Sequence, residues 1–159
     1  AITIDAWTTY LSIREQSSVA LVSVSALDRM STVLAPTTAT PSTVTIDGTT
    51  YIASATTFIA TLPSVAADGS ALPGGIDTVI YTAADDGLLE IVNVGSGTRE
   101  SHRHQIVDTR LESVSMVFTP VGGGTVQPTV AVTLTLRASL PNRTITESRT
   151  RTIVLRNVQ

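Results

Sequence analysis

The chain has 159 residues, no cysteine and a net charge of −3 at pH 7, with charged residues making up 14% of it. This length suits one domain with a real hydrophobic core, and the lack of cysteine excludes disulfides and thiolate metal sites. The sparse, slightly acidic charge lacks the basic surface typical of nucleic-acid-binding proteins, so we expect no nucleic-acid contact.

The first predicted element is a long helix, from about Asp5 to Leu34. Its apolar residues recur at a roughly helical period. They are Ile13, Ala20, Val24, Leu27, Met30 and Leu34. Asp5 is a candidate N-cap, and Pro36 ends the helix because proline disfavours a helical conformation in the residue before it. Serine, threonine and valine are weak helix formers, so we expect the apolar stripe to pack on a sheet formed by the rest of the chain.

The middle of the chain predicts strands joined in hairpins. Residues 44–54 carry Asp47-Gly48 between two β-rich arms, a strong hairpin signal. A strand at 57–62 is followed by a loop at 63–75, which is rich in Ala, Gly, Pro and Ser. A second predicted hairpin joins a strand at 77–82 to another at 88–94.

The last third begins with a polar segment at 95–105, and residues 106–112 then suit either one helical turn or a crossing strand. Three strands follow, and the second alternates apolar and threonine residues, which indicates a sheet with one buried face. They are expected at 113–119, 129–138 and 144–157, with a turn at 139–143. The sequence thus predicts a single α+β domain, with a long amphipathic helix in residues 1–35 packed on antiparallel sheet in residues 36–159.

Three short motifs resemble one family in their order and spacing. The tail Thr152-Ile153-Val154-Leu155-Arg156-Asn157 resembles the end of PilW-like type IV minor pilins and of the J-type minor pseudopilins of type II secretion. In those families the last strand often ends in an apolar-Leu-Arg-Asn signature. Residues 78–81 with Asp86-Gly87-Leu88-Leu89 are similar to their "Val-x-Tyr … Asp-Gly-x-Leu" hairpin. Residues 110–118 are similar to the segment that leads into their "Val-x-x-x-x-Phe" strand.

The resemblance implies a pilin-like fold and a structural role. Such a subunit helps to initiate or cap a pilus or pseudopilus, performs no catalysis, and has other pilin or pseudopilin subunits as partners. It also implies a membrane-spanning helix preceding this chain, which would anchor the protein in the inner membrane and place it at the bacterial cell surface or in the periplasm. On this interpretation helix packing and assembly involve a set of residues spread along the helix. They are Trp7, Tyr10, Ile13, Ala20, Val24, Leu27 and Leu34.

Two alternatives stay open. Trp7 and Tyr10 could meet a neighbouring helix in a filament, or could pack under the first hairpin. An extracellular β-rich binding or adhesin module is the alternative function, although such modules usually expose aromatic side chains and only 4% of this chain is aromatic. We find no catalytic constellation, and therefore expect no enzyme.

Three polar or glycine-rich motifs give only weak signals for metal or phosphate binding. His102-Arg103-His104 could bind a metal from one strand face, but only Glu100 and Asp108 are close in sequence, which favours a solvated loop. We expect no cofactor, with calcium at the Asp85-Asp86-Gly87 turn as the alternative kept open. The Gly122-Gly123-Gly124 run lacks the lysine and helix of a phosphate loop.

Two further motifs lie near the end of the chain. Asn142-Arg143-Thr144 matches a glycosylation sequon, a pattern that is frequent by chance. Arg149 and Arg151 share one face of the last strand. That face is either solvated, or protects the strand edge, or contacts an acidic neighbour.

Overall fold

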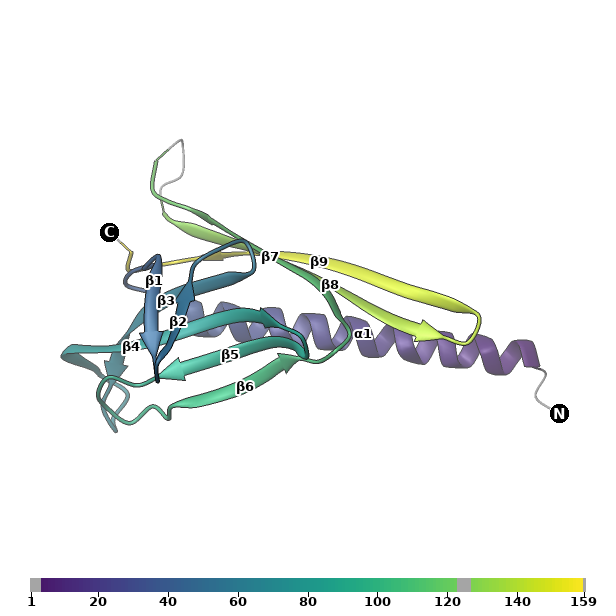
Figure 1. Cartoon of the computed structure of the whole chain (residues 1–159), viewed down its shortest axis with the longest axis horizontal. Coiled ribbons are helices and arrows are strands. Elements are labelled where there is room, and N and C mark those ends of the chain that lie inside the picture. Colours follow the sequence, from purple (N-terminus) through teal and green to yellow (C-terminus); the bar gives the residue numbers. More distant parts are fainter. Residues whose placement is uncertain (1–3, 123–126, 159) are drawn as a thin grey trace.

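The computed structural model describes residues 4–122 and 127–158. Within them a single helix, α1 (Ile4–Leu34), precedes nine strands in three antiparallel sheets, as Figure 1 shows. The strands are β1 (Thr43–Ile46), β2 (Thr49–Ile52), β3 (Thr57–Val65), β4 (Ala71–Ala84), β5 (Gly87–Asn93), β6 (His102–Val107), β7 (Leu111–Thr119), β8 (Thr129–Leu140) and β9 (Arg143–Val154). The predicted α+β class, with one N-terminal helix and antiparallel sheets, is confirmed.

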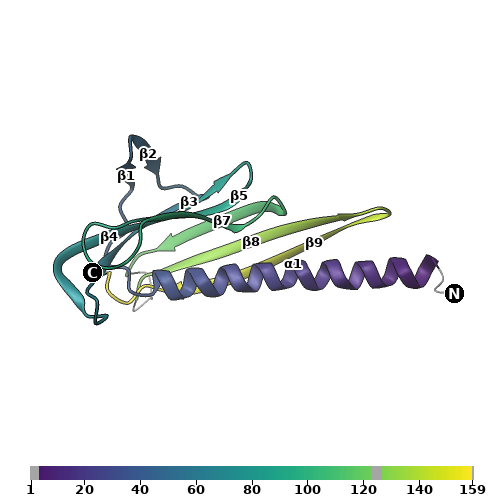
Figure 2. The ribbon, with the colours of Figure 1, turned by 90° about the horizontal axis from the view of Figure 1, so that it is seen from below.

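The sheet β7-β8-β9 lies directly on α1 (Figures 1 and 2). Its central strand β8 alternates as the sequence predicts, and the apolar residues of one face are all fully buried. They are Val130, Val132, Leu134 and Leu136. On the facing side of α1, Leu27, Met30 and Leu34 complete the same core cluster. The burial of this alternating face supplies the packing that a helix of low intrinsic propensity requires.

A second sheet, in the order β3-β4-β5-β6, contributes its inner face to the same core. Phe58, Val79, Tyr81 and Leu88 point into that cluster. The opposite face of this sheet is covered in part by the β1–β2 hairpin, whose Ile46 packs in a smaller cluster with isoleucines of β3, β4 and β5. The protein therefore has one main core under α1 and one satellite core under the hairpin.

The predicted hairpin turn at Asp47-Gly48 is confirmed. Both residues have positive φ, 50° and 78°, as a two-residue turn of type I′ requires. The turn at Asp85-Asp86 joins β4 to β5, as predicted. There Gly87 has φ 134°, and a Cβ at this position would lie 2.0 Å from the carbonyl oxygen of Val107, so no larger residue fits.

The C-terminal tail closes the fold against the end of α1. The N–H of Leu155 donates to the carbonyl of Pro128 at 2.9 Å, and the N–H of Arg156 donates to the carbonyl of Ala35 at 3.0 Å. The Asn157 side chain donates to the carbonyl of Pro36 at 3.3 Å. Leu155 is fully buried, whereas the neighbouring Val154 is exposed. The C-terminal tail thus ties the end of β9 to the residues that follow α1.

Several predicted boundaries are wrong. The loop expected at 63–75 is short, because β3 continues to Val65 and β4 begins at Ala71. Pro63 is tolerated in β3 because that strand lies at the sheet edge, where a missing N–H costs little. The polar segment at 95–105 is not a loop throughout, since β6 begins at His102. Asp5 lies inside the first turn of a helix that begins at Ile4, where its charge still suits the helix dipole.

Other boundaries move by a few residues. The turn expected at 139–143 shortens to Pro141-Asn142, which places the sequon's Asn142 at the tip of the β8–β9 hairpin. Residues 106–112 form the crossing between the two larger sheets rather than a helical turn. Two residues of the glycine run noted at 122–124, Gly123 and Gly124, lie outside the described part of the chain.

Candidate functional site

The predicted apolar stripe of α1 only partly packs on the sheet. Leu27 and Leu34 are buried and Ala20 is half-buried, but Ile13 is 60% exposed and Val24 is also exposed. The interpretation of the whole stripe as core is therefore wrong for Ile13 and Val24. A strict seven-residue spacing drifts by about 20° per repeat on an α-helix, so the stripe turns away from the sheet toward the N-terminus.

Helix α1 consequently carries a second apolar face, directed at solvent. Its large exposed side chains occupy the helix from its first turn to the middle of its length. They are Ile4, Trp7, Tyr10, Ile13, Leu21 and Val24. Leu21 is 70% exposed and Trp7 is 53% exposed. Large apolar side chains that recur exposed along one helix are a candidate interaction surface, and we refer to these six residues as the open face of α1.

Trp7 and Tyr10 form a stacked pair, with ring centroids 5.7 Å apart. Trp7 also borders an apolar hollow of about 170 Å³, together with Leu11 and with Leu140 and Pro141 at the β8–β9 turn. The alternative in which Trp7 packs under the first hairpin, β1–β2, is therefore wrong. The nearby hairpin is the last one, β8–β9, and Trp7 stays exposed beside it.

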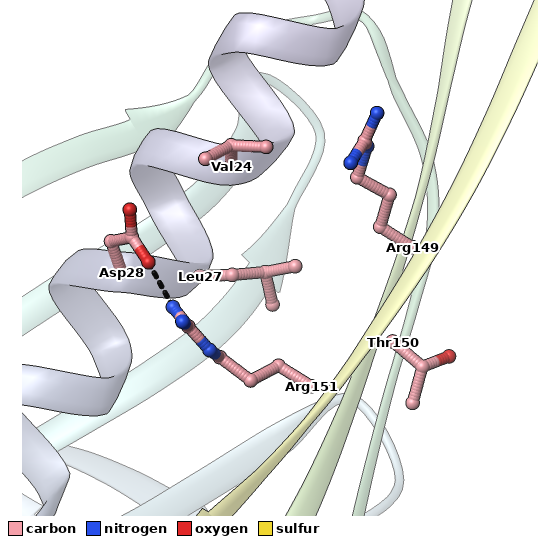
Figure 3. Close-up of a pocket in the computed structure, with 6 residues that line it drawn as sticks. All are labelled: Val24, Leu27, Asp28, Arg149, Thr150 and Arg151. Atoms are coloured by element: carbon pink, nitrogen blue, oxygen red, sulfur yellow. Dashed lines mark hydrogen bonds and ion pairs between the residues drawn. The ribbon is translucent and has the colours of Figure 1, made fainter.

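A groove separates α1 from β9 beside the open face (Figure 3). It has a volume of about 270 Å³, and Val24 and Leu27 of the helix face Arg149 and Arg151 of the strand. Arg151 forms an ion pair with Asp28 of α1, and Arg149 pairs with Glu147 on its own strand. The two arginines that the sequence places on one strand face thus border the helix, and Arg151 links the helix to β9.

A buried carboxylate connects α1 to the other large sheet. Glu90 of β5 is fully buried, and Arg29 of α1 holds it through two hydrogen bonds, from Nε at 3.0 Å and from a terminal nitrogen at 2.5 Å. The Tyr81 hydroxyl donates to the same carboxylate at 2.7 Å, and His102 Nε2 lies 2.8 Å from it. These four side chains come from α1, β4, β5 and β6, and we call them the Glu90 cluster.

The Glu90 cluster shifts the pKa of its members. Burial alone raises the pKa of Glu90, but the hydrogen bonds from Arg29, His102 and Tyr81 outweigh burial and hold that pKa below its usual range. Burial and the adjacent carboxylate raise the pKa of the Tyr81 hydroxyl. The hydrogen bond to Glu90 raises the pKa of the Arg29 guanidinium. The lowered pKa keeps the carboxylate ionised at neutral pH, so the cluster is a charged brace between α1 and the β3–β6 sheet.

Sequence reasoning missed this partner of His102. It considered Glu100 and Asp108 because they are close in sequence, whereas Glu90 is brought to His102 by the pairing of β5 with β6. One signal was available: a single glutamate within the apolar run at 88–94 must find a partner if that strand is buried. His104 pairs in register with Glu90 on the neighbouring strand, but within residues 4–122 and 127–158 no group of three or more His, Asp or Glu side chains is arranged to hold a metal.

A second buried carboxylate, Asp77 of β4, fixes the segment between β5 and β6. Ser64 donates to it at 2.5 Å, the N–H of Gly95 donates at 3.1 Å, and Arg99 forms an ion pair with it. Near the crossing into β7, Arg110 pairs with Asp108 and donates to Ser18 of α1 at 2.8 Å. Hydrogen bonds from Arg110 lower the pKa of Asp108. The polar contacts thus brace the sheets and α1.

Comparison with known proteins gives no relative. No family model, no curated protein and no solved structure matches the chain. In the described part of the chain, α1 is not apolar enough over a sufficient length to cross a membrane.

Proposed function

We propose that this chain is a structural minor subunit of a type IV pilus or a type II secretion pseudopilus, which helps to initiate or cap the filament and performs no catalysis. Its partners are other pilin or pseudopilin subunits, at the bacterial cell surface or in the periplasm, and a preceding apolar helix anchors it in the inner membrane. The resemblance of the tail Val154-Leu155-Arg156-Asn157 and the order of one helix followed by antiparallel sheets support this proposal.

The open face of α1 is the observation that carries the proposal. With 31 residues at about 1.5 Å each, α1 is a rod of about 46 Å. Its N-terminal end extends beyond the sheets in both views (Figures 1 and 2). Large apolar side chains on a projecting helix cost solubility in a monomer, and they are buried if neighbouring helices pack against them.

The arrangement of the sheets also suits this role. Both large sheets pack on one side of α1, so they do not cover Trp7, Tyr10, Ile13 or Leu21. In a filament the open face would point toward the other helices and the sheets would point outward. The β9 side of α1, with Arg149 and the Arg151–Asp28 pair, would then border the helix contact.

Site-specific cross-linking in cells tests the proposal. Residues 1–159 contain no cysteine, so Leu21→Cys in the full-length gene product places the one thiol of this domain on the open face. A second variant, Thr135→Cys, places the thiol on the face of β8 directed away from α1. We expect Leu21→Cys to cross-link to another filament subunit, and to be recovered with sheared filaments, whereas Thr135→Cys gives little cross-linking to helices.

Two results would contradict the proposal. The first is absence of the protein from the filament fraction under conditions in which filaments are made. The second is equal cross-linking of both variants to the same neighbours, which would mean that the open face is not a specific contact.

A further inference from the structure

A second hollow lies on the side of the β3–β6 sheet that faces away from α1. It occupies the space between the β1–β2 hairpin and the β5–β6 edge of that sheet and has a volume of about 300 Å³. This is the lower end of the range for small-molecule sites. Asp47 and Tyr51 line it from the hairpin, and Ile91, Asn93 and Arg103 line it from the sheet. Residues about 40 to 60 positions apart in the sequence therefore meet around one space.

Two of the polar residues that line this hollow are held by the fold: Ser101 accepts a hydrogen bond from the N–H of Val94, and His102 belongs to the Glu90 cluster. Three others are not. In the described part of the chain, no hydrogen bond or ion pair engages the Asp47 carboxylate, the Asn93 amide or the Arg103 guanidinium. This contrasts with the buried carboxylates Asp77 and Glu90, which are both multiply hydrogen-bonded. Polar groups that converge on a hollow without structural partners are available to a ligand.

We infer that this hollow binds a neutral sugar residue. A sugar hydroxyl both donates and accepts hydrogen bonds. The lining offers an acceptor in Asp47, a donor in Arg103 and both in Asn93. The C–H face of a sugar ring requires apolar contact, which the half-buried ring of Tyr51 in the wall of the hollow provides.

The charges of the lining argue against anionic ligands. Asp47 and Arg103 carry opposite charges, so the hollow has no net attraction for a phosphate or a carboxylate, and Asp47 would repel either one. A neutral polyhydroxylated ring can instead use the aspartate and the arginine at once, through charge-assisted hydrogen bonds. The chemistry therefore favours a hydroxylated ring over an anion.

The walls of the hollow are fixed before any ligand binds. Ile46 and Tyr51 pack on Ile59, Ile80 and Ile91, which holds the hairpin against the sheet. The type I′ turn sets the position of Asp47. On the far side of the sheet, the Glu90 cluster immobilises His102, the residue before Arg103. A preformed site loses less conformational entropy on binding, which matters for a ligand as small as one sugar.

The test is an NMR titration of the isotope-labelled chain with four free sugars: glucose, galactose, mannose and N-acetylglucosamine. We expect at least one of them to cause saturable shifts of backbone amides at 46–51 and 91–103, with no comparable shifts in β8 or β9. Arg103→Ala should weaken that binding by about tenfold or more, because it removes a charge-assisted hydrogen bond. Asp47→Asn should also weaken it while keeping the turn, since asparagine tolerates positive φ.

Arg137→Ala is the matched control. Arg137 is also an exposed arginine on a strand, but it lies on the face of β8 directed away from α1, so this change should leave the affinity unaltered. The inference is overturned if none of the four sugars gives saturable shifts, or if both Arg103→Ala and Asp47→Asn bind as tightly as the unaltered chain. Filament assembly does not need this hollow, so the two proposals succeed or fail separately.

Discussion

The two halves of α1 differ in how much of their surface the sheets bury. From Val19 onward the helix buries a regular series of side chains under the sheets, and Arg29 ties it to the buried Glu90. Before Val19 only Ser12 is buried, and its hydroxyl has no hydrogen-bond partner among the described residues. Most large apolar side chains of this first half, Trp7 and Ile13 among them, are exposed, whereas Leu11 is half-buried. The second half thus packs its inner side on the sheets while Leu21 and Val24 stay exposed, whereas the first half leaves most of its large apolar side chains exposed.

The largest expected effect is a core truncation in the second half. Leu27→Ala removes a buried side chain and should lower the free energy of unfolding by about 2–5 kcal/mol. Ile13→Ala, the matched truncation in the first half, should change it by less than about 0.5 kcal/mol because Ile13 is exposed. Urea denaturation of both variants measures the difference. Similar losses of unfolding free energy in the two variants would show that both halves of α1 contribute equally to folding.

A substitution in the Glu90 cluster tests how much polar contacts contribute to the packing of the second half of α1. Glu90→Gln keeps the shape but replaces the charged acceptor of Arg29, Tyr81 and His102, so we expect a loss of about 1–3 kcal/mol. Asp86→Asn, an acid-to-amide change in an exposed turn, is the control and should be nearly neutral. A Glu90→Gln protein as stable as the unaltered chain would show that the brace contributes nothing.

The same variant predicts a pH dependence. The folded pKa of Glu90 is below its usual range, so its contribution to stability is complete above the unfolded pKa of about 4.3. That contribution is lost as the pH falls through the lower folded pKa. The stability difference between the unaltered chain and Glu90→Gln should therefore be constant from pH 7 to about pH 5 and shrink below about pH 4. Urea denaturation across this range measures it, and a constant difference down to pH 3 would contradict the role of the charge.

The smallest expected effect concerns the link between α1 and β9. Arg151 and Asp28 are both substantially exposed, so Arg151→Ala should cost about 0.2–1 kcal/mol, and less at high salt. Thermal melts at low and high ionic strength measure this. A loss as large as that of Leu27→Ala would mean that the groove between α1 and β9 contributes more to folding than its exposure indicates.

Local sequence patterns were sufficient to predict much of the fold. The alternation in β8, the Asp47-Gly48 turn and the long helix were all predictable because each depends on residues near one another in sequence. The ends of β3 and β4 were not, since the pairing of Pro63 with Ile76 overrides the turn-forming composition of that segment. Strand pairing, a non-local property, decided where those strands end.

The candidate sites were less predictable for the same reason. The heptad spacing suggested one apolar face, but the slow rotation of that spacing on a real helix divides it between the core and the open face. Glu90 meets His102 only when β5 pairs with β6, and it meets Arg29 only when α1 packs on that sheet. In the chain, 61 positions separate Arg29 from Glu90. The hollow beside Asp47 likewise depends on how the hairpin packs over β5 and β6.

The position of β9 has a consequence for biosynthesis. The ribosome makes α1 first, but the strands that pack most closely on it, β8 and β9, are made last. The tail that fastens to Ala35 and Pro36 emerges later still. Until β8 and β9 are made, the core face of α1 can pack only on the β3–β6 sheet, so completion of the core must wait for contacts of long sequence separation. The nascent protein is therefore exposed to aggregation and is a natural client for chaperones until its final strand is complete.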